Sequence, residues 1–142
     1  MKRVVVGTDG SKKASAALQW AINYASTHDG VVRVVNVWEF PYIASEAATM
    51  AIPSRDVFEG AAQAIVDEAL THVDTKGVTI ERIVREGQPA HVLLDEAQRA
   101  DLLVVGARGH GGFAGLLLGS VATQCARHPT VPTVIVPTGE DE

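Results

Sequence analysis

Glycine and serine residues gather in one segment of the chain, and their arrangement suits phosphate binding. Six glycines fall within the fourteen positions from Gly106 to Gly119, and Ser120 follows at the expected start of a helix. Glycine loses more backbone entropy on folding than any other residue, so a plain connection would gain little from so many. Bare main-chain N–H groups can approach a ligand closely, and a helix start adds unpaired donors. The segment therefore predicts a main-chain cradle for a phosphate group.

Two simpler interpretations of the same segment stay open. Ser120 can be only a helix N-cap, and the glycines can serve only tight turns. The segment lacks the Gly-Lys-Ser/Thr of a Walker loop, and the first predicted strand is not followed by the glycine fingerprint of dinucleotide-binding proteins. The two common nucleotide signatures are thus excluded.

A second polar loop, Asp9-Gly10-Ser11, follows the apolar run from Val4 to Val6. A carboxylate beside phosphates is repulsive unless it meets a ribose hydroxyl or a cation, so Asp9 favours one of those partners. An Asx-type turn is the alternative for this residue. Arg108 can contact phosphate, although arginines in loops are often only solvated.

Three further residues have reactive side chains, but we expect none of them to take part in catalysis. No partner in the sequence would orient His110 or His128 as a base, so we expect an exposed loop residue and a helix-end residue. Nothing near Cys125 in the sequence would lower the pKa of its thiol, so we expect it to pack in the core.

Short runs rich in valine and isoleucine alternate with longer runs of helical periodicity, which indicates parallel strands connected by helices. The segment 38–53 has no convincing period and is expected to be a long connection, with room for a short helix. This order predicts an α/β fold, a doubly wound five-stranded parallel sheet with helices on both faces, whose ligands bind beyond the first and fourth strands. The expected strands are 4–6, 31–37, 79–84, 102–105 and 133–136, and the expected helices are 12–26, 54–73, 89–100 and 120–127.

Length and composition narrow the class of protein. The 142 residues predict one domain spanning 1–142, and 46% apolar residues are enough for a core. A net charge of −5 and an aromatic content of only 5% disfavour a nucleic-acid partner. The chain starts directly with an expected strand and holds no apolar stretch of membrane-spanning length, so we expect a cytoplasmic protein without a membrane partner.

The sequence resembles the universal stress protein family along most of its length. Gly106, Gly109, Gly119 and Ser120 match all four fixed positions of the motif Gly-x2-Gly-x9-Gly-Ser/Thr, which is typical of nucleotide-binding members. The stretches 4–11, 101–106 and 132–137 resemble the first strand with its loop, the fourth strand and the closing strand of the family. Residues from Phe40 to Arg55 match no pattern.

The resemblance implies a Rossmann-like domain of the universal stress protein type with an ATP site. The first loop would lie against the ribose and phosphates, and Val37 would offer main-chain groups to adenine. The glycine loop would wrap the ribose and triphosphate, with Mg²⁺ or Mn²⁺ on the phosphates; the metal ligands are not identified. The expected site residues are Gly7, Thr8, Asp9, Val37, Gly106, Ala107, Arg108, Gly109, His110, Gly111, Gly112, Gly119, Ser120, Val121 and Ala122.

We expect a stress-response binding or signalling module more than an enzyme. An efficient ATPase needs a water-orienting residue, and the sequence offers no clear candidate, which leaves slow hydrolysis or self-phosphorylation open. The family also implies a homodimer through the last strand, Thr133 to Val136. The alternatives are a nucleotide-independent dimeric interaction protein, a binder of AMP or cyclic AMP and, ranked last, a hydrolase of adenine nucleotides, whose glycine-serine loop Gly7 to Ser11 does not match.

Overall fold

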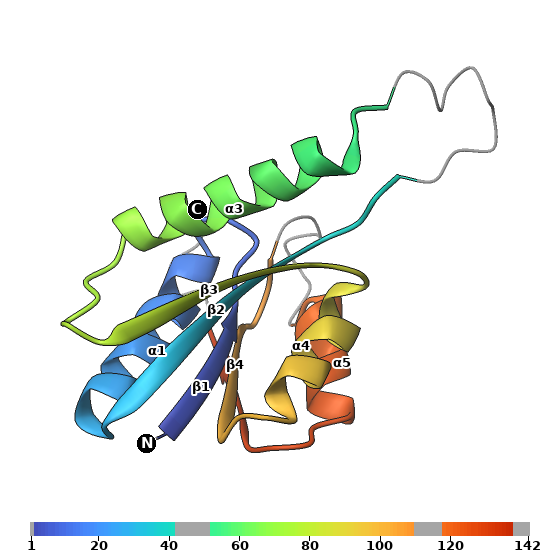
Figure 1. Cartoon of the computed structure of the whole chain (residues 1–142). Helices are drawn as coiled ribbons and strands as arrows, with labels where there is room; N and C mark the ends of the chain where they lie inside the picture. Colours follow the sequence, from blue (N-terminus) through green and yellow to red (C-terminus); the bar gives the residue numbers. More distant parts are fainter. Residues whose placement is uncertain (1, 42–51, 110–117, 138–142) are drawn as a thin grey trace.

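The computed structural model describes residues 2–41, 52–109 and 118–137. In these ranges one five-stranded parallel sheet has the order β3-β2-β1-β4-β5 (Figure 1). The chain order reverses between β1 and β4, which confirms the predicted doubly wound sheet. The strands are β1 (Lys2–Gly7), β2 (Gly30–Trp38), β3 (Thr79–Glu86), β4 (Leu102–Gly106) and β5 (Thr133–Val136). The helices are α1 (Ala14–Thr27), α3 (Arg55–Thr71), α4 (Pro89–Ala97) and α5 (Ser120–Arg127).

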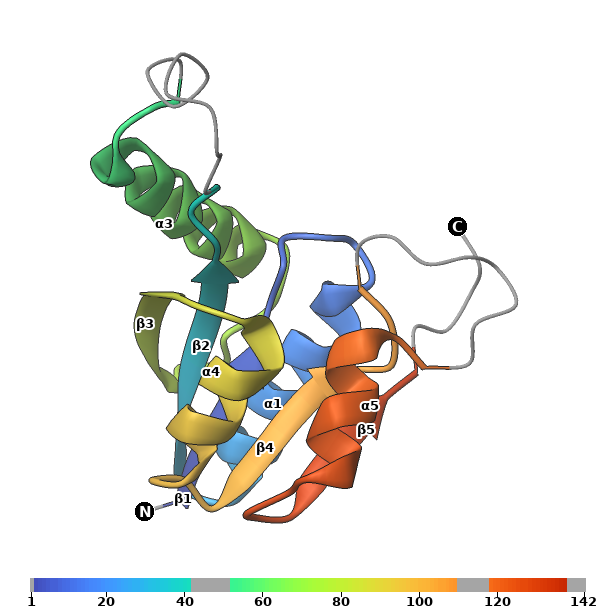
Figure 2. The same cartoon turned by 90° about the vertical axis from the view of Figure 1, so that its right-hand side faces the viewer.

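Helices cover both faces of the sheet, α1 and α3 on one side and α4 and α5 on the other (Figures 1 and 2). Successive side chains of a strand point to opposite faces. In β1, Val4 and Val6 therefore pack against α1, while Val5 packs on the side of α4 and α5. All three are fully buried. A strand buried on both faces has to be apolar without alternation, which explains why β1 and β4 were recognisable in the sequence.

The described helices start within two residues of their predicted positions. The first helix begins at Ala14 instead of residue 12, because the residues before it form a separate turn. In this turn the Ser11 Oγ accepts the Ala14 N–H at 3.2 Å. Ser54 occupies the N-cap of α3, but its side chain makes no capping hydrogen bond. Before α4, Gln88 accepts the His91 N–H at 2.8 Å and Pro89 takes the first helical position, as proline's missing donor permits.

The two edge strands of the sheet differ in character. Strand β3 runs two residues beyond the predicted end, to Glu86, and carries Glu81, Arg82 and Arg85. Charged side chains are tolerated there because an edge strand is only partly covered, and they discourage pairing with another strand. Strand β5, at the opposite edge, has the uncharged sequence Thr-Val-Ile-Val.

The described helices include none that is long and apolar enough to cross a membrane. Strand β2 continues to Trp38, which was expected to begin the long connection. Residues 42–51 of that connection, where a short helix was considered, lie outside the described residues.

Candidate functional site

A cavity of about 490 Å³ lies at the carboxyl ends of β1 and β4, where the order of the sheet reverses. Figure 2 shows the loop after β1 and the chain after β4 next to each other at this end of the molecule. The volume is in the range of sites for small molecules. The described lining residues are Gly7, Thr8, Asp9, Ala14, Val35, Val37, Pro89, Leu93, Val105, Gly106, Ala107, Arg108, Gly109, Gly119, Ser120, Val121 and Ala122.

Every expected site residue that the structure describes borders this one cavity. The remaining three, His110, Gly111 and Gly112, lie outside the described residues. Residues about 70 to 115 positions apart in the chain are thus brought to a single hollow. Their contact with a nucleotide stays a prediction.

The loop after β1 is fixed by its own hydrogen bonds. The Thr8 N–H donates to the Val35 carbonyl at 2.9 Å, and the Thr8 hydroxyl accepts the Gly10 N–H at 3.2 Å. Asp9 Oδ1 accepts the Ser11 N–H at 2.9 Å, which is the Asx turn considered as an alternative. Asp9 also lines the cavity, so the residue that shapes the loop borders the ligand space.

The three glycines of the second loop that the structure describes do not serve left-handed turns. Gly106, Gly109 and Gly119 all lack a positive φ angle, so their backbone conformation suits other residues as well. A Cβ on Gly109 would lie 2.6 Å from Asp9 Oδ2, whereas a Cβ on Gly106 or Gly119 would make an ordinary contact at 3.4 Å. A side chain at position 109 would thus have to displace the carboxylate of Asp9, whose Oδ1 accepts the Ser11 N–H.

The start of α5 closes the cavity at its polar end. Its N-cap is Gly119, so the interpretation of Ser120 as the cap is wrong. The Gly119 N–H donates to the Ala107 carbonyl at 2.7 Å, which ties the helix start to the chain after β4. The amides of Ser120, Val121 and Ala122 precede the first intrahelical donor, and all three residues border the cavity. An anion placed there would meet these donors and the positive end of the helix.

Apolar side chains form the other end of the cavity. Val35 and Val37 come from β2, and Pro89 and Leu93 come from α4. Leu93 packs so closely on the first strand that a Cβ on Gly7 would lie 2.9 Å from Leu93 Cδ1. The lining residues that were not predicted from the sequence are Val35, Pro89 and Leu93, together with Ala14 and Val105. Two signals were present: Val35 shares a strand face with Val37, and Pro89 and Leu93 are one helical turn apart.

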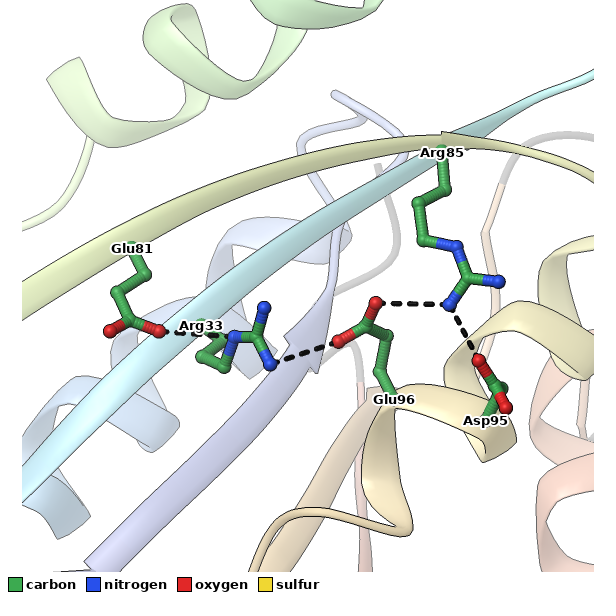
Figure 3. A network of polar contacts seen from close by, with 5 residues as sticks. All are labelled: Arg33, Glu81, Arg85, Asp95 and Glu96. Atoms are coloured by element: carbon green, nitrogen blue, oxygen red, sulfur yellow. Dashed lines mark hydrogen bonds and ion pairs between the residues drawn. The ribbon is translucent and has the colours of Figure 1, made fainter.

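A charged network joins α4 to β2 and β3 (Figure 3). Glu96, only 8% exposed, lies between Arg33 Nη1 at 3.1 Å and Arg85 Nη1 at 3.0 Å. Arg33 Nε also lies 3.0 Å from Glu81, and Arg85 Nη1 donates to Asp95 at 2.8 Å. The contacts of Arg33 are ion pairs without hydrogen-bond geometry. The network fixes α4, whose first turns carry Pro89 and Leu93.

Charge pairing shifts the pKa values of two groups in this network, Asp95 and Arg85. The hydrogen bond from Arg85 is the main reason why the pKa of Asp95 lies below its ordinary value. The same bond, followed by the one to Glu96, raises the pKa of Arg85. Both shifts stabilise the charged forms of the two groups.

Two other residues with reactive side chains, Cys125 and His128, have roles in packing and at a helix end. Cys125 is fully buried, and burial raises the pKa of its thiol to about 11, which confirms a packing role. His128 is the C-cap residue of α5, at the helix end that was expected. The described parts of the chain hold no group of three His, Cys, Asp or Glu side chains arranged for a metal ion.

Comparison with known proteins agrees with this architecture. The family model described as the universal stress protein family matches residues 1–137. A universal stress protein of Mycolicibacterium smegmatis is 32% identical over 147 residues, which cover 98% of this chain and 49% of the relative. The chain spans about half the length of the first curated relatives that it matches.

Two solved structures of similar proteins contain an adenine nucleotide. One is a universal stress protein in complex with cAMP, with a TM-score of 0.70 and 32% identity over 97% of this chain and 98% of the other. The second is a family protein from Arabidopsis thaliana with AMP bound, with a TM-score of 0.64 and 20% identity over 96% and 92%. At that lower identity the likeness concerns the fold alone. Sheet order, glycine motif and the match over nearly the whole chain agree: this chain belongs to the universal stress protein family.

Proposed function

We propose that the chain, as one universal stress protein domain, binds an adenine nucleotide, ATP foremost, in the cavity between β1 and β4. The observation that carries the proposal is the division of the cavity into two unlike ends. One end is apolar, between β2 and α4, and suits a flat base. The other end presents the amides of Ser120, Val121 and Ala122, and suits phosphate.

The ligands named for two related structures support this choice of base. One relative was solved with cAMP and another with AMP, and both share the fold of this chain. The same observation makes AMP or cyclic AMP the second candidate ligand, since both carry adenosine and a phosphate. We keep ATP first because the whole motif from Gly106 to Ser120 is present.

A divalent ion, Mg²⁺ or Mn²⁺, would accompany the phosphates of ATP. Asp9 is the carboxylate that lines the described part of the cavity, and hard cations prefer such oxygen ligands. The phosphate oxygens would supply further ligands, because the described residues offer no acidic cluster. The proposed activity is binding, with any hydrolysis slow, since no described lining residue other than Asp9 can act as a base.

Titration calorimetry with ATP, AMP and cyclic AMP, each with and without magnesium, tests the proposal. In Gly109→Ala the new methyl group displaces the carboxylate of Asp9, which lines the cavity, and the affinity should fall by about tenfold, or about 1.4 kcal/mol. Gly60→Ala is the matched control, because Gly60 lies on α3 outside the described lining and a Cβ there meets no atom within 4 Å, so the affinity should stay within about threefold. No binding of any adenine nucleotide to the native protein would contradict the proposal and favour a nucleotide-independent interaction protein.

We further propose that two copies pair through β5. This edge strand is uncharged, whereas β3 at the opposite edge carries four charged side chains. An uncovered apolar edge is prone to pairing, so a second copy is its natural cover. Ile135→Lys places a charge in this edge and should shift the sedimentation coefficient from dimer to monomer. An unchanged dimer in that variant would mean that the interface lies elsewhere.

A further inference from the structure

We propose that Asn36 is a positioning residue that keeps the main-chain groups of Val37 available to the base of the ligand. The inference rests on the proposed adenine-nucleotide site and names what recognises its base. Asn36 lies in β2, is 5% exposed, and its side chain points to the face of α1 and α3 with Val34. It does not border the cavity in the described structure, so it acts through its neighbours.

The hydrogen-bond pattern of β2 shows where the Val37 main chain points. In a parallel sheet, alternate residues direct both the N–H and the C=O to the same neighbouring strand. The Val35 carbonyl accepts the Thr8 N–H at 2.9 Å, so Val35 and Val37 face β1. The Trp38 carbonyl accepts the Gly87 N–H at 2.9 Å, so the even-numbered residues face β3. If the ladder continued, the Val37 N–H would donate to the Thr8 carbonyl.

Asn36 takes that carbonyl instead. Its Nδ2 donates to Thr8 O at 2.8 Å, in a buried contact between residues 28 positions apart. The ladder between β1 and β2 ends at the pair Gly7 and Val35, and the described backbone hydrogen bonds outside the regular elements include none that joins Val37 to Thr8. A buried carbonyl needs a partner, and the Asn36 amide satisfies this one without the Val37 N–H.

The consequence is a donor and an acceptor at the edge of the cavity. Val37 lines the cavity, and its N–H and C=O face the space that β1 leaves when the chain turns at Asp9. Adenine offers an acceptor, N1, next to a donor, the N6 amino group, and so matches this pair. Guanine places a donor, N1–H, and an acceptor, O6, in the reverse order and does not match in the orientation that adenine takes. Asn36 therefore supports selection of adenine over guanine.

Hydrogen exchange of single amides, followed by nuclear magnetic resonance, tests the first step without any ligand. In the native protein the Val37 amide should exchange much faster than the Val35 amide, which is inside the ladder. In Asn36→Leu the freed Thr8 carbonyl recruits the Val37 N–H, and the Val37 amide should become protected by about fivefold to tenfold, the effect of one net hydrogen bond. A general loosening of the structure would change protection in the opposite direction.

Binding of adenosine and guanosine tests the second step. Asn36→Leu should lose about tenfold in affinity for adenosine and most of its preference over guanosine, whereas Asn23→Leu, at an exposed position on α1, should keep both. A Val37 amide as slow as Val35 in the native protein, or unchanged adenosine affinity in Asn36→Leu, would overturn the inference. If the native protein bound neither adenosine nor ATP, the proposed function would fail, while the exchange data would still decide whether Asn36 frees Val37.

Discussion

Replacing Glu96 by glutamine should destabilise the fold far more than neutralising an exposed carboxylate. Glu96→Gln keeps the shape but removes the charge that lies between Arg33 at 3.1 Å and Arg85 at 3.0 Å. Breaking a fully buried ion pair costs about 3–5 kcal/mol. Because the two arginine side chains are 24% and 36% exposed and keep other partners, we expect about 2 kcal/mol.

Urea denaturation measures this loss. With a slope of about 2 kcal/mol per molar urea, the midpoint of Glu96→Gln should fall by about 1 M. The matched control is Asp67→Asn, which removes one carboxylate from the exposed pair with Arg82 and should cost at most about 1 kcal/mol. A midpoint shift for Glu96→Gln no larger than that of the control would refute the reasoning that this network fixes α4.

Two predictions concern titratable groups. At pH 8, a thiol with a pKa of about 11 is ionised in about one molecule in a thousand, so Cys125 should react with a disulfide reagent only after denaturation; rapid labelling of the native protein would contradict its burial. The pKa of Asp95 is lower in the folded than in the unfolded chain, so its bond to Arg85 stabilises above the ordinary carboxyl pKa of about 3.9 and is lost as the pH falls below it. The difference in urea midpoint between the native protein and Asp95→Asn should therefore shrink from pH 6 to below pH 4, and a difference independent of pH would argue against this bond.

The sequence predicted the sheet because its strands have distinct composition and clear ends. The apolar runs of β1 and β4 stop at Gly7 and Gly106, and helix α5 begins and ends where periodicity placed it. Strand β3 was predicted to end two residues too early, at residue 84, because the charged Arg85 and Glu86 are not typical of a buried strand. An edge strand admits charged residues, and only the tertiary structure says which strand is at the edge.

The loops of the candidate site could be predicted from the sequence, but the contacts that hold these loops in place could not. Glycine spacing drew attention to residues that border the cavity, because a local pattern carried the signal. The contacts that support them join Asn36 to Thr8 and Glu96 to Arg33, across 28 and 63 positions of the chain. Arg33 stands out as a charged residue among the valines of β2, which indicates that it needs a partner of opposite charge. Its partner depends on how α4 packs, which local sequence does not specify.

Helix α3 and strand β3 contribute no residue to the described lining of the cavity. The exposed side chains of α3 and β3 can therefore differ without changing this lining, whereas Ile65 of α3 lies against Gly10 in the loop after β1 and Val66 is buried in the core. A chimera that carries α3 and β3 of a related chain would have a different outer surface and the same described cavity lining. The exchanged segments would have to keep Glu81, which contacts Arg33 of β2, and Arg85, which contacts Glu96 of α4, together with the buried core residues of α3.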